Sequence, residues 1–177
     1  QIQDLHANGD FKFICYTPMD SSDWTDVMMD CSRRFDKLIT YTEFGANEFM
    51  RAGYDKPIDV LPHGISTKMF YPMSQKACRK KLGIDPDAFI VFNGNRNQVR
   101  KRQDITIRAF ARFAVDKPET RLYLNCGTKD QGWDVMKLFG REMSKNGLDG
   151  NNRIIMTTNT TNGPSVTVDL LNTIYNC

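Results

Sequence analysis

The chain has 177 residues, of which 40% are hydrophobic and 25% are charged, and its formal net charge is +3. No apolar run approaches the roughly 18 residues that a membrane-spanning helix needs, and the composition is that of a globular protein. These values exclude a disordered chain, a collagen, a coiled coil and a membrane span. Five cysteines at irregular spacing, without a CxxC pair, argue against a structural zinc site and favour a reducing, cytoplasmic compartment.

The charge is unevenly distributed along the chain. Residues 1–72 carry 7 lysines and arginines against 11 aspartates and glutamates, whereas residues 73–117 carry 11 against 4. A basic middle third is typical of a protein with an anionic partner, which can be a phosphate group, a nucleotide, a nucleic acid or an acidic surface.

The first 65 residues alternate between predicted strands and helices. Strands are predicted at residues 11–17, 37–41 and 58–61, because each run is short, apolar and rich in β-branched or aromatic side chains. A Pro-His-Gly turn at residues 62–64 ends the third strand.

Two helices are predicted between these strands. Asp23 is expected to cap a helix that runs to about Phe35, with an apolar face made by Trp24, Val27, Met28 and Cys31. Thr42 is expected to cap the second helix and Gly53 to end it, and its apolar anchors are Phe44, Phe49 and Met50.

Residues 74–177 show the same alternation. Strands are predicted at 88–93, 121–126 and 153–156, and helices at 74–82, 101–116, 133–146 and 167–175. The helix at 101–116 is expected to bury Ile105, Ala109 and Phe113, with Phe110 and Ala114 beside them.

This alternation predicts an α/β fold with parallel sheets in two halves. We expect the halves to span residues 1–65 and 74–177, with an interdomain linker at 66–73 that shows little periodicity. Each half lacks elements of a complete sheet, so we expect the chain to be an internal piece of a larger protein.

The polar loop after the strand at 88–93 is the strongest candidate for a binding site. It carries Gly94 and four basic residues, and it leads from a strand into a helix. Ligands of open α/β sheets bind at the carboxyl ends of strands, and a helix N-terminus favours an anion. Arg96 can form a bidentate pair of hydrogen bonds with a diphosphate, and Lys101 can add a positive charge. The alternative interpretation is a basic loop that is simply solvated.

Other interpretations of this basic stretch use the same residues. The loop is neither a P-loop nor a dinucleotide-binding fingerprint, because GxxxxGK and GxGxxG are both absent. The stretch 96–112 can instead track a nucleic-acid backbone, although the loop holds no aromatic residue for base stacking. A third interpretation is an α/β enzyme of another nucleotide-using class.

Asp20 and His63 each follow a predicted strand in the first half. Each can face a cleft, where Asp20 would accept hydrogen bonds from a polyol, or each can be a turn residue. His6 lies in a polar segment and has little weight as a site residue. No Ser-His-Asp arrangement, Cys-His arrangement or carboxylate pair is visible, and no metal site is expected.

Several of these segments occur together in an order that resembles a known family. The runs are Tyr-Thr-Glu-Phe-Gly-Ala at 41–46, Ile-Asp-Val-Leu-Pro-His-Gly-Ile at 58–65 and Phe-Tyr-Pro at 70–72. They resemble the passage between the two domains of the retaining glycosyltransferases of family 4. Arg96 and Lys101 match the Arg and Lys that hold the donor diphosphate in that family, whereas Arg102 stands where many members have Gly.

The resemblance implies a GT-B fold, in which two Rossmann-like domains enclose the active site. Residues 1–65 would be the end of the acceptor-side domain, and residues 74–177 the start of the donor domain. It implies transfer from a nucleotide-diphosphate sugar, with retention and without a metal, to a glycan, lipid or protein acceptor. No cofactor is implied, and nucleic acid is an unlikely partner. The family's Glu-x7-Glu segment is absent from these residues, so we expect the fragment to be inactive alone.

Overall fold

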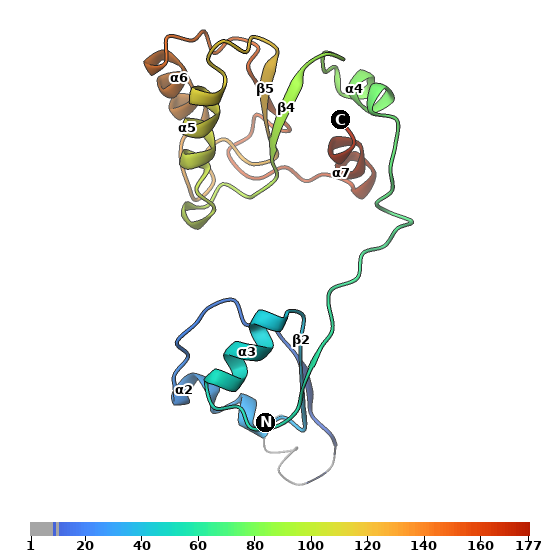
Figure 1. The fold of residues 1–177 in the computed structure, drawn as a ribbon. Helices are drawn as coiled ribbons and strands as arrows, with labels where there is room; N and C mark the ends of the chain where they lie inside the picture. The colour runs from blue at the N-terminus through green and yellow to red at the C-terminus, as the bar shows by residue number, and fades with distance from the viewer. Residues whose placement is uncertain (1–8, 10) are drawn as a thin grey trace. The chain divides into compact units, whose positions relative to one another are not determined.

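The computed structural model describes residue 9 and residues 11–177 (Figure 1). His6 and the other residues up to 8, together with residue 10, lie outside the described residues. The chain divides into two compact units, residues 1–65 (unit 1) and residues 66–177 (unit 2). Among the helices that the structure describes, none is both long and apolar enough to cross a membrane.

Unit 1 contains a parallel sheet of three short strands. These are β1 (Ile14–Tyr16), β2 (Lys37–Thr40) and β3 (Ile58–Val60), and they lie side by side in chain order. Leu38 stands opposite Cys15 on one side and Ile58 on the other, and its side chain is fully buried. The three predicted strands are therefore confirmed, each shortened at its ends because only the paired residues remain in the ladder.

The first predicted helix is wrong in its length and its buried face. Asp23 does not cap the helix, because the N-cap position is occupied by Thr25. The helix α2 covers only Asp26–Met29 and is followed by a short 3-10 turn, η1 (Ser32–Arg34). Met29 is fully buried, whereas Val27 is 85% exposed and Met28 is also exposed. The single turn therefore presents Met29 to the core, where it joins Leu38 and Phe49.

The second helix, α3 (Glu43–Arg51), begins and ends as predicted. The Thr42 side chain accepts a hydrogen bond from the Gly45 N–H, and Gly53 takes φ of 89° just beyond the last turn. Of its three expected anchors only Phe49 is buried, because Phe44 and Met50 lie on other faces and are exposed. A Cβ at Gly45 would lie 2.6 Å from the Thr40 hydroxyl, so the glycine lets α3 pack closely on β2.

Unit 2 has a second parallel sheet, covered by helices on both faces (Figure 1). Its strands lie in the order β4 (Phe89–Asn93), β5 (Thr120–Leu124) and β6 (Ile154–Met156). The helices α5 (Gln103–Phe113) and α6 (Val135–Lys145) cover one face, and α4 (Gln75–Leu82) and α7 (Val168–Tyr175) cover the other. The central strand explains this arrangement, because Leu122 and Leu124 point to one cluster and Tyr123 to the other.

The helix predicted at 101–116 differs from α5 in its start and its face. A 3-10 turn, η2 (Val99–Lys101), precedes α5, and Arg102 between them takes φ of 50°. The left-handed residue breaks the helix, so Lys101 belongs to η2. The expected buried face is also wrong, because Ile105 and Phe113 are both exposed. The buried side chains of α5 and of the residue after it are those of Gln103, Asp104, Ile107, Phe110, Ala111 and Ala114.

The segment 66–73 is tied to unit 2 by its backbone. The Tyr71 N–H donates to the Asn172 side chain (3.3 Å), and the Met73 N–H donates to that of Asn176 (2.8 Å). Both asparagines belong to α7 or its end, so this stretch is joined to the last helix of the unit by amide groups about a hundred residues away in the sequence.

Candidate functional site

The carboxyl ends of β4 and β5 open into a cavity of about 410 Å³. Gly94 and Arg96 line it from the loop after β4, Asn125 and Cys126 from the loop after β5, and residues 162–164 from the loop after β6. This is the edge of a parallel sheet at which ligands bind. Three loops that are distant in the sequence therefore build one concave site, and two predicted site residues belong to it.

Arg96 is oriented by an acidic residue that the sequence analysis did not single out. Its Nε donates to Oδ2 of Asp130 (2.6 Å) and its Nη2 donates to Oδ1 (3.0 Å). The Asp130 carboxylate is only 4% exposed, whereas the Arg96 side chain is 56% exposed. This pair of bonds raises the pKa of Arg96 and lowers the pKa of Asp130. Both groups are therefore charged at neutral pH, and the guanidinium is fixed at one edge and open at the other.

Asn97 joins the loops after β4 and β5. Its side chain is fully buried, and its Nδ2 lies within hydrogen-bonding distance of three backbone carbonyls, those of Gly127, Lys129 and Trp133. Its Oδ1 accepts from the Trp133 N–H at 3.1 Å. A Cβ at Gly132 would collide with the Asn97 amide, so this glycine is needed for the close approach. Asn97 therefore joins the backbone next to Arg96 to the backbone on both sides of Asp130.

A polar atom without a partner lies at the cavity. The Asn125 Oδ1 is buried and accepts no hydrogen bond in the described structure, although the backbone N–H of Asn125 donates to the Asn93 carbonyl (3.1 Å). A buried acceptor of this kind is costly unless a ligand or water supplies a donor. The neighbouring Cys126 is a neutral thiol at physiological pH, because burial raises its pKa to about 11.

The second predicted diphosphate ligand, Lys101, is not among the residues that line this cavity. Lys101 is half-buried in η2 and does not line the cavity, whereas Gly94 and Arg96 do. The backbone explains its place, since the 3-10 turn and the left-handed Arg102 lie between the loop and α5. A Cβ at Gly94 would lie 3.0 Å from the Phe92 ring, so a larger residue would crowd the entrance of the loop.

Three of the six cations in the stretch 96–112 lie next to two carboxylates within unit 2. Arg102 donates to both carboxylate oxygens of Asp104 at 2.9 Å, and Arg108 lies 3.7 Å from the same carboxylate. The pairing with Arg102 lowers the pKa of Asp104, which is therefore ionised at neutral pH. Together with the Arg96–Asp130 pair, these contacts weaken the field that a nucleic-acid backbone would meet.

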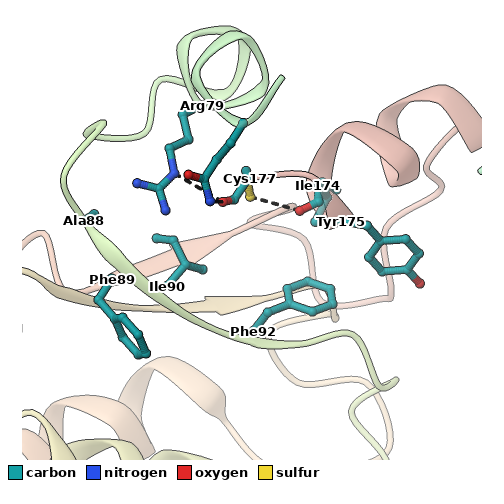
Figure 2. Close-up of a pocket in the computed structure, with 9 residues that line it drawn as sticks. Arg79, Ala88, Phe89, Ile90, Phe92, Ile174, Tyr175 and Cys177 are labelled. Carbon is teal, nitrogen blue, oxygen red and sulfur yellow. Dashed lines mark hydrogen bonds between the residues drawn. The ribbon is translucent and has the colours of Figure 1, made fainter. Parts of the chain in front are cut away.

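A second, smaller cavity lies between β4 and the helices α4 and α7. This cavity of about 340 Å³ is bordered by Phe89 and Phe92 of β4 and by residues of α4 and α7 (Figure 2). Figure 2 shows Arg79 directed at the end of the chain, where its Nε donates to the Cys177 carbonyl (3.2 Å). The one cation on its wall is thus bonded to backbone, and the remaining wall is mainly apolar.

In unit 1 the two predicted residues have different surroundings. Asp20 is exposed, and its side chain has no hydrogen-bond partner within the described part of the chain. His63 is also exposed, but its Nδ1 lies 3.0 Å from the Tyr16 hydroxyl, and its ring centroid lies 4.3 Å from that of Tyr41. The structure therefore places His63 in a cluster of rings. In the portion of the protein that is described, no group of three or more His, Cys, Asp and Glu side chains is arranged to hold a metal ion.

Comparison with known proteins finds relatives for part of the chain. No family model matches it. The D-inositol 3-phosphate glycosyltransferase of Stackebrandtia nassauensis is 34% identical over 87 residues, which cover 48% of this chain and 19% of that protein. The enzyme of the same name from Segniliparus rotundus is 34% identical over 89 residues, which cover 49% and 20%. The matched stretches thus span about a fifth of the length of these relatives.

Solved structures resemble the chain more extensively. The Anabaena protein HepE, crystallised in complex with UDP and glucose, superposes with a TM-score of 0.50 at 18% identity over 74% of this chain and 35% of that chain. The N-terminal domain of the Candida albicans trehalose-6-phosphate phosphatase superposes with a TM-score of 0.61 at 14% identity. The superposition covers 98% of this chain and 45% of that chain. With the two parallel three-stranded sheets, this likeness confirms the expected GT-B-like α/β fold class.

Proposed function

We propose that the chain belongs to an enzyme that transfers a sugar from a nucleoside-diphosphate sugar, and that unit 2 binds the donor. Relatives named as glycosyltransferases match half of the chain, and one structural neighbour was crystallised with UDP and glucose. The observation that carries the proposal is the half-exposed Arg96 guanidinium, held by a buried carboxylate beside a cavity at the carboxyl ends of parallel strands.

The geometry of Arg96 suits a diphosphate. A guanidinium has five N–H donors in a planar fork, and the two bonds to Asp130 use two of them, so three remain for an anion. Because Asp130 and Asn97 fix the group in advance, little side-chain entropy is lost on binding. A positive charge placed where the leaving diphosphate develops negative charge lowers the barrier to transfer.

The finer parts of the proposal follow the family resemblance. We propose that transfer proceeds with retention and without a metal ion, and that Lys101 joins Arg96 at the diphosphate once the donor is bound. Unit 1 would then serve the acceptor. All five cysteines are free thiols, which supports our proposal of a cytoplasmic enzyme.

Calorimetric titration of the chain with UDP, GDP, ADP and inorganic pyrophosphate tests the donor site. We expect Arg96→Ala to weaken the binding of the preferred diphosphate at least about tenfold, which is about 1.4 kcal/mol. The matched control is Arg112→Ala, because Arg112 is an exposed arginine of α5 that does not line the cavity. Equal weakening by both variants, or no diphosphate binding by the unsubstituted chain, would contradict the assignment.

The same titration addresses the nucleic-acid alternative. Binding through the stretch 96–112 would appear as affinity for an oligonucleotide that falls steeply with salt, without preference for a nucleoside diphosphate. We expect the opposite, because Asp104 and Asp130 already neutralise arginines of that stretch.

A further inference from the structure

Three neighbouring strands of unit 1 deliver three rings to one edge of their sheet. Tyr16 is the last residue of β1, Tyr41 follows β2, and His63 follows β3. The Tyr16 and His63 rings meet edge to face at 5.3 Å, and the Tyr41 and His63 rings lie 4.3 Å apart at 32°. Because parallel strands end at the same edge, this cluster occupies in unit 1 the position that the Arg96 cavity occupies in unit 2.

The hydrogen bonds of Tyr16 determine where the proton of His63 is. The Tyr16 hydroxyl oxygen lies 2.8 Å from the Leu61 carbonyl oxygen and 3.0 Å from the Nδ1 of His63. A carbonyl has no proton to give, so the single proton of the phenol must lie between the two oxygens. The bond between Tyr16 and His63 can then form only if Nδ1 carries a proton and donates it to the phenol oxygen.

The other nitrogen of the ring is left as an acceptor. A neutral imidazole has one N–H, so a proton on Nδ1 leaves Nε2 with a free lone pair. Within the described residues no group bonds to this nitrogen, and His63 is exposed. The tilted Tyr41 ring, 4.3 Å away, and the bond to Tyr16 fix the orientation of the His63 ring, so the lone pair has a defined direction.

We infer that His63 Nε2 is a binding site for a hydroxyl group of a polyol, with the rings of Tyr16 and Tyr41 as its apolar border. The Nε2 lone pair of a neutral imidazole accepts a hydrogen bond from a hydroxyl group and repels an anion. The aromatic rings offer apolar surface to the C–H groups of a sugar or cyclitol. The inference rests on the proposed function in one respect, namely that a sugar transferase needs a hydroxyl group as acceptor.

The tautomer is measured first, by long-range proton–nitrogen NMR of the uniformly ¹⁵N-labelled chain at a pH where the ring is neutral. The chain has two histidines, so His6→Gln assigns the signals. We expect Nδ1 to have the shift of a protonated nitrogen and Nε2 that of an unprotonated one. In Tyr16→Phe we expect the ring to return to the Nε2–H form that free imidazoles favour. An Nε2–H tautomer in the unsubstituted chain would overturn the inference.

Polyol binding is then measured in the same sample, with myo-inositol and D-glucose as the probes. We expect a saturable shift of the His63 Nε2 signal, weakened about fivefold in Tyr16→Phe by loss of one orienting hydrogen bond. In the unsubstituted chain we also expect the Tyr41 ring-proton signals to shift saturably with the polyol. His63→Phe keeps an aromatic ring beside Tyr41 but removes both nitrogens, and we expect it to abolish these Tyr41 shifts. No saturable shift with either polyol, or unchanged binding in His63→Phe, would overturn the assignment.

These measurements separate the two proposals. UDP binding at Arg96 without a polyol effect at His63 would overturn only the hydroxyl site. Absence of diphosphate binding would overturn the proposed donor site, whatever the tautomer of His63.

Discussion

Unit 1 and unit 2 both consist of a three-stranded parallel sheet with strands in chain order, yet the carboxyl edges of the two sheets carry different chemistry. In unit 2 the edge carries a guanidinium, a buried carboxylate and amides that fix the loops. In unit 1 it carries two phenol rings and an imidazole. Strand order therefore determines where a site lies, and the residues just beyond each strand determine what the site can bind.

The two units also differ in how their sheets are covered. Leu122 and Tyr123 of β5 are both buried, on opposite faces, so helices cover the two sides of the unit 2 sheet. In unit 1 the described residues form one buried cluster around Leu38, and Ile14 of β1 is 60% exposed. Unit 2 is thus the more complete layered structure, and its loops have the firmer support.

The largest effects are expected from matched core truncations, Leu122→Ala in unit 2 and Leu38→Ala in unit 1. Both side chains are fully buried, so each substitution should reduce the free energy of unfolding of its own unit by about 3–5 kcal/mol. Trp133 reports on unit 2 and Trp24 on unit 1, so denaturant unfolding is followed by fluorescence after the other tryptophan is changed to Phe. A loss of equal size in both units from either substitution would show that the units unfold as one.

The next effect concerns the loops of unit 2 that Asn97 joins. Asn97→Leu leaves the Trp133 N–H and buried carbonyls without their partner, and we expect it to lower the free energy of unfolding of unit 2 by about 3 kcal/mol. The control is the exposed Asn159→Ala, which should change little. A near-neutral Asn97→Leu would mean that the loops after β4 and β5 are held by other contacts.

A pH effect should follow from the ion pair at the carboxyl edge of the unit 2 sheet. Because Arg96 lowers the pKa of Asp130 below its ordinary value of 3.8, the unfolded chain binds the proton more readily. The stabilisation is fully present above pH of about 4 and is lost as the pH falls through the lowered pKa of the folded state. Asp130→Asn should therefore make the unfolding midpoint of unit 2 less dependent on pH below 4, whereas exposed Asp149→Asn should not. If the unfolding midpoints of the two variants fall equally steeply below pH 4, the stabilising role of the Arg96–Asp130 pair is contradicted.

The smallest effect tests the single-turn helix of unit 1. Val27→Ala and Met28→Ala should each change the free energy of unfolding by no more than about 0.5 kcal/mol, because both side chains are exposed. The longer helix expected from the sequence would bury both and predict losses of a kilocalorie or more. Unfolding of unit 1 followed through Trp24 decides between the two arrangements.

Features that depend on neighbouring residues were predictable from the sequence. Thr42 caps α3 through a hydrogen bond from the N–H three residues ahead, and Gly53 follows its last turn with a positive φ. The strands were found from short apolar runs, and the position of Arg96 at the end of a strand followed from the same pattern. The buried faces of α2 and α5 were not predictable, because each helix carries apolar side chains on more than one face. Only tertiary packing decides which of these faces is buried.

The sequence by itself therefore determined the alternation of strands and helices, the Thr42 cap of α3, and the loop that carries Gly94 and Arg96, because these depend on local backbone preferences and hydrophobic spacing. Only the tertiary structure decided that Asp130 orients Arg96 across 34 residues, that Asn97 joins two loops, and that Tyr16 fixes the proton of His63 across 47. Partners at such separations leave no periodic signal, since they meet only when parallel strands bring their carboxyl ends to one edge.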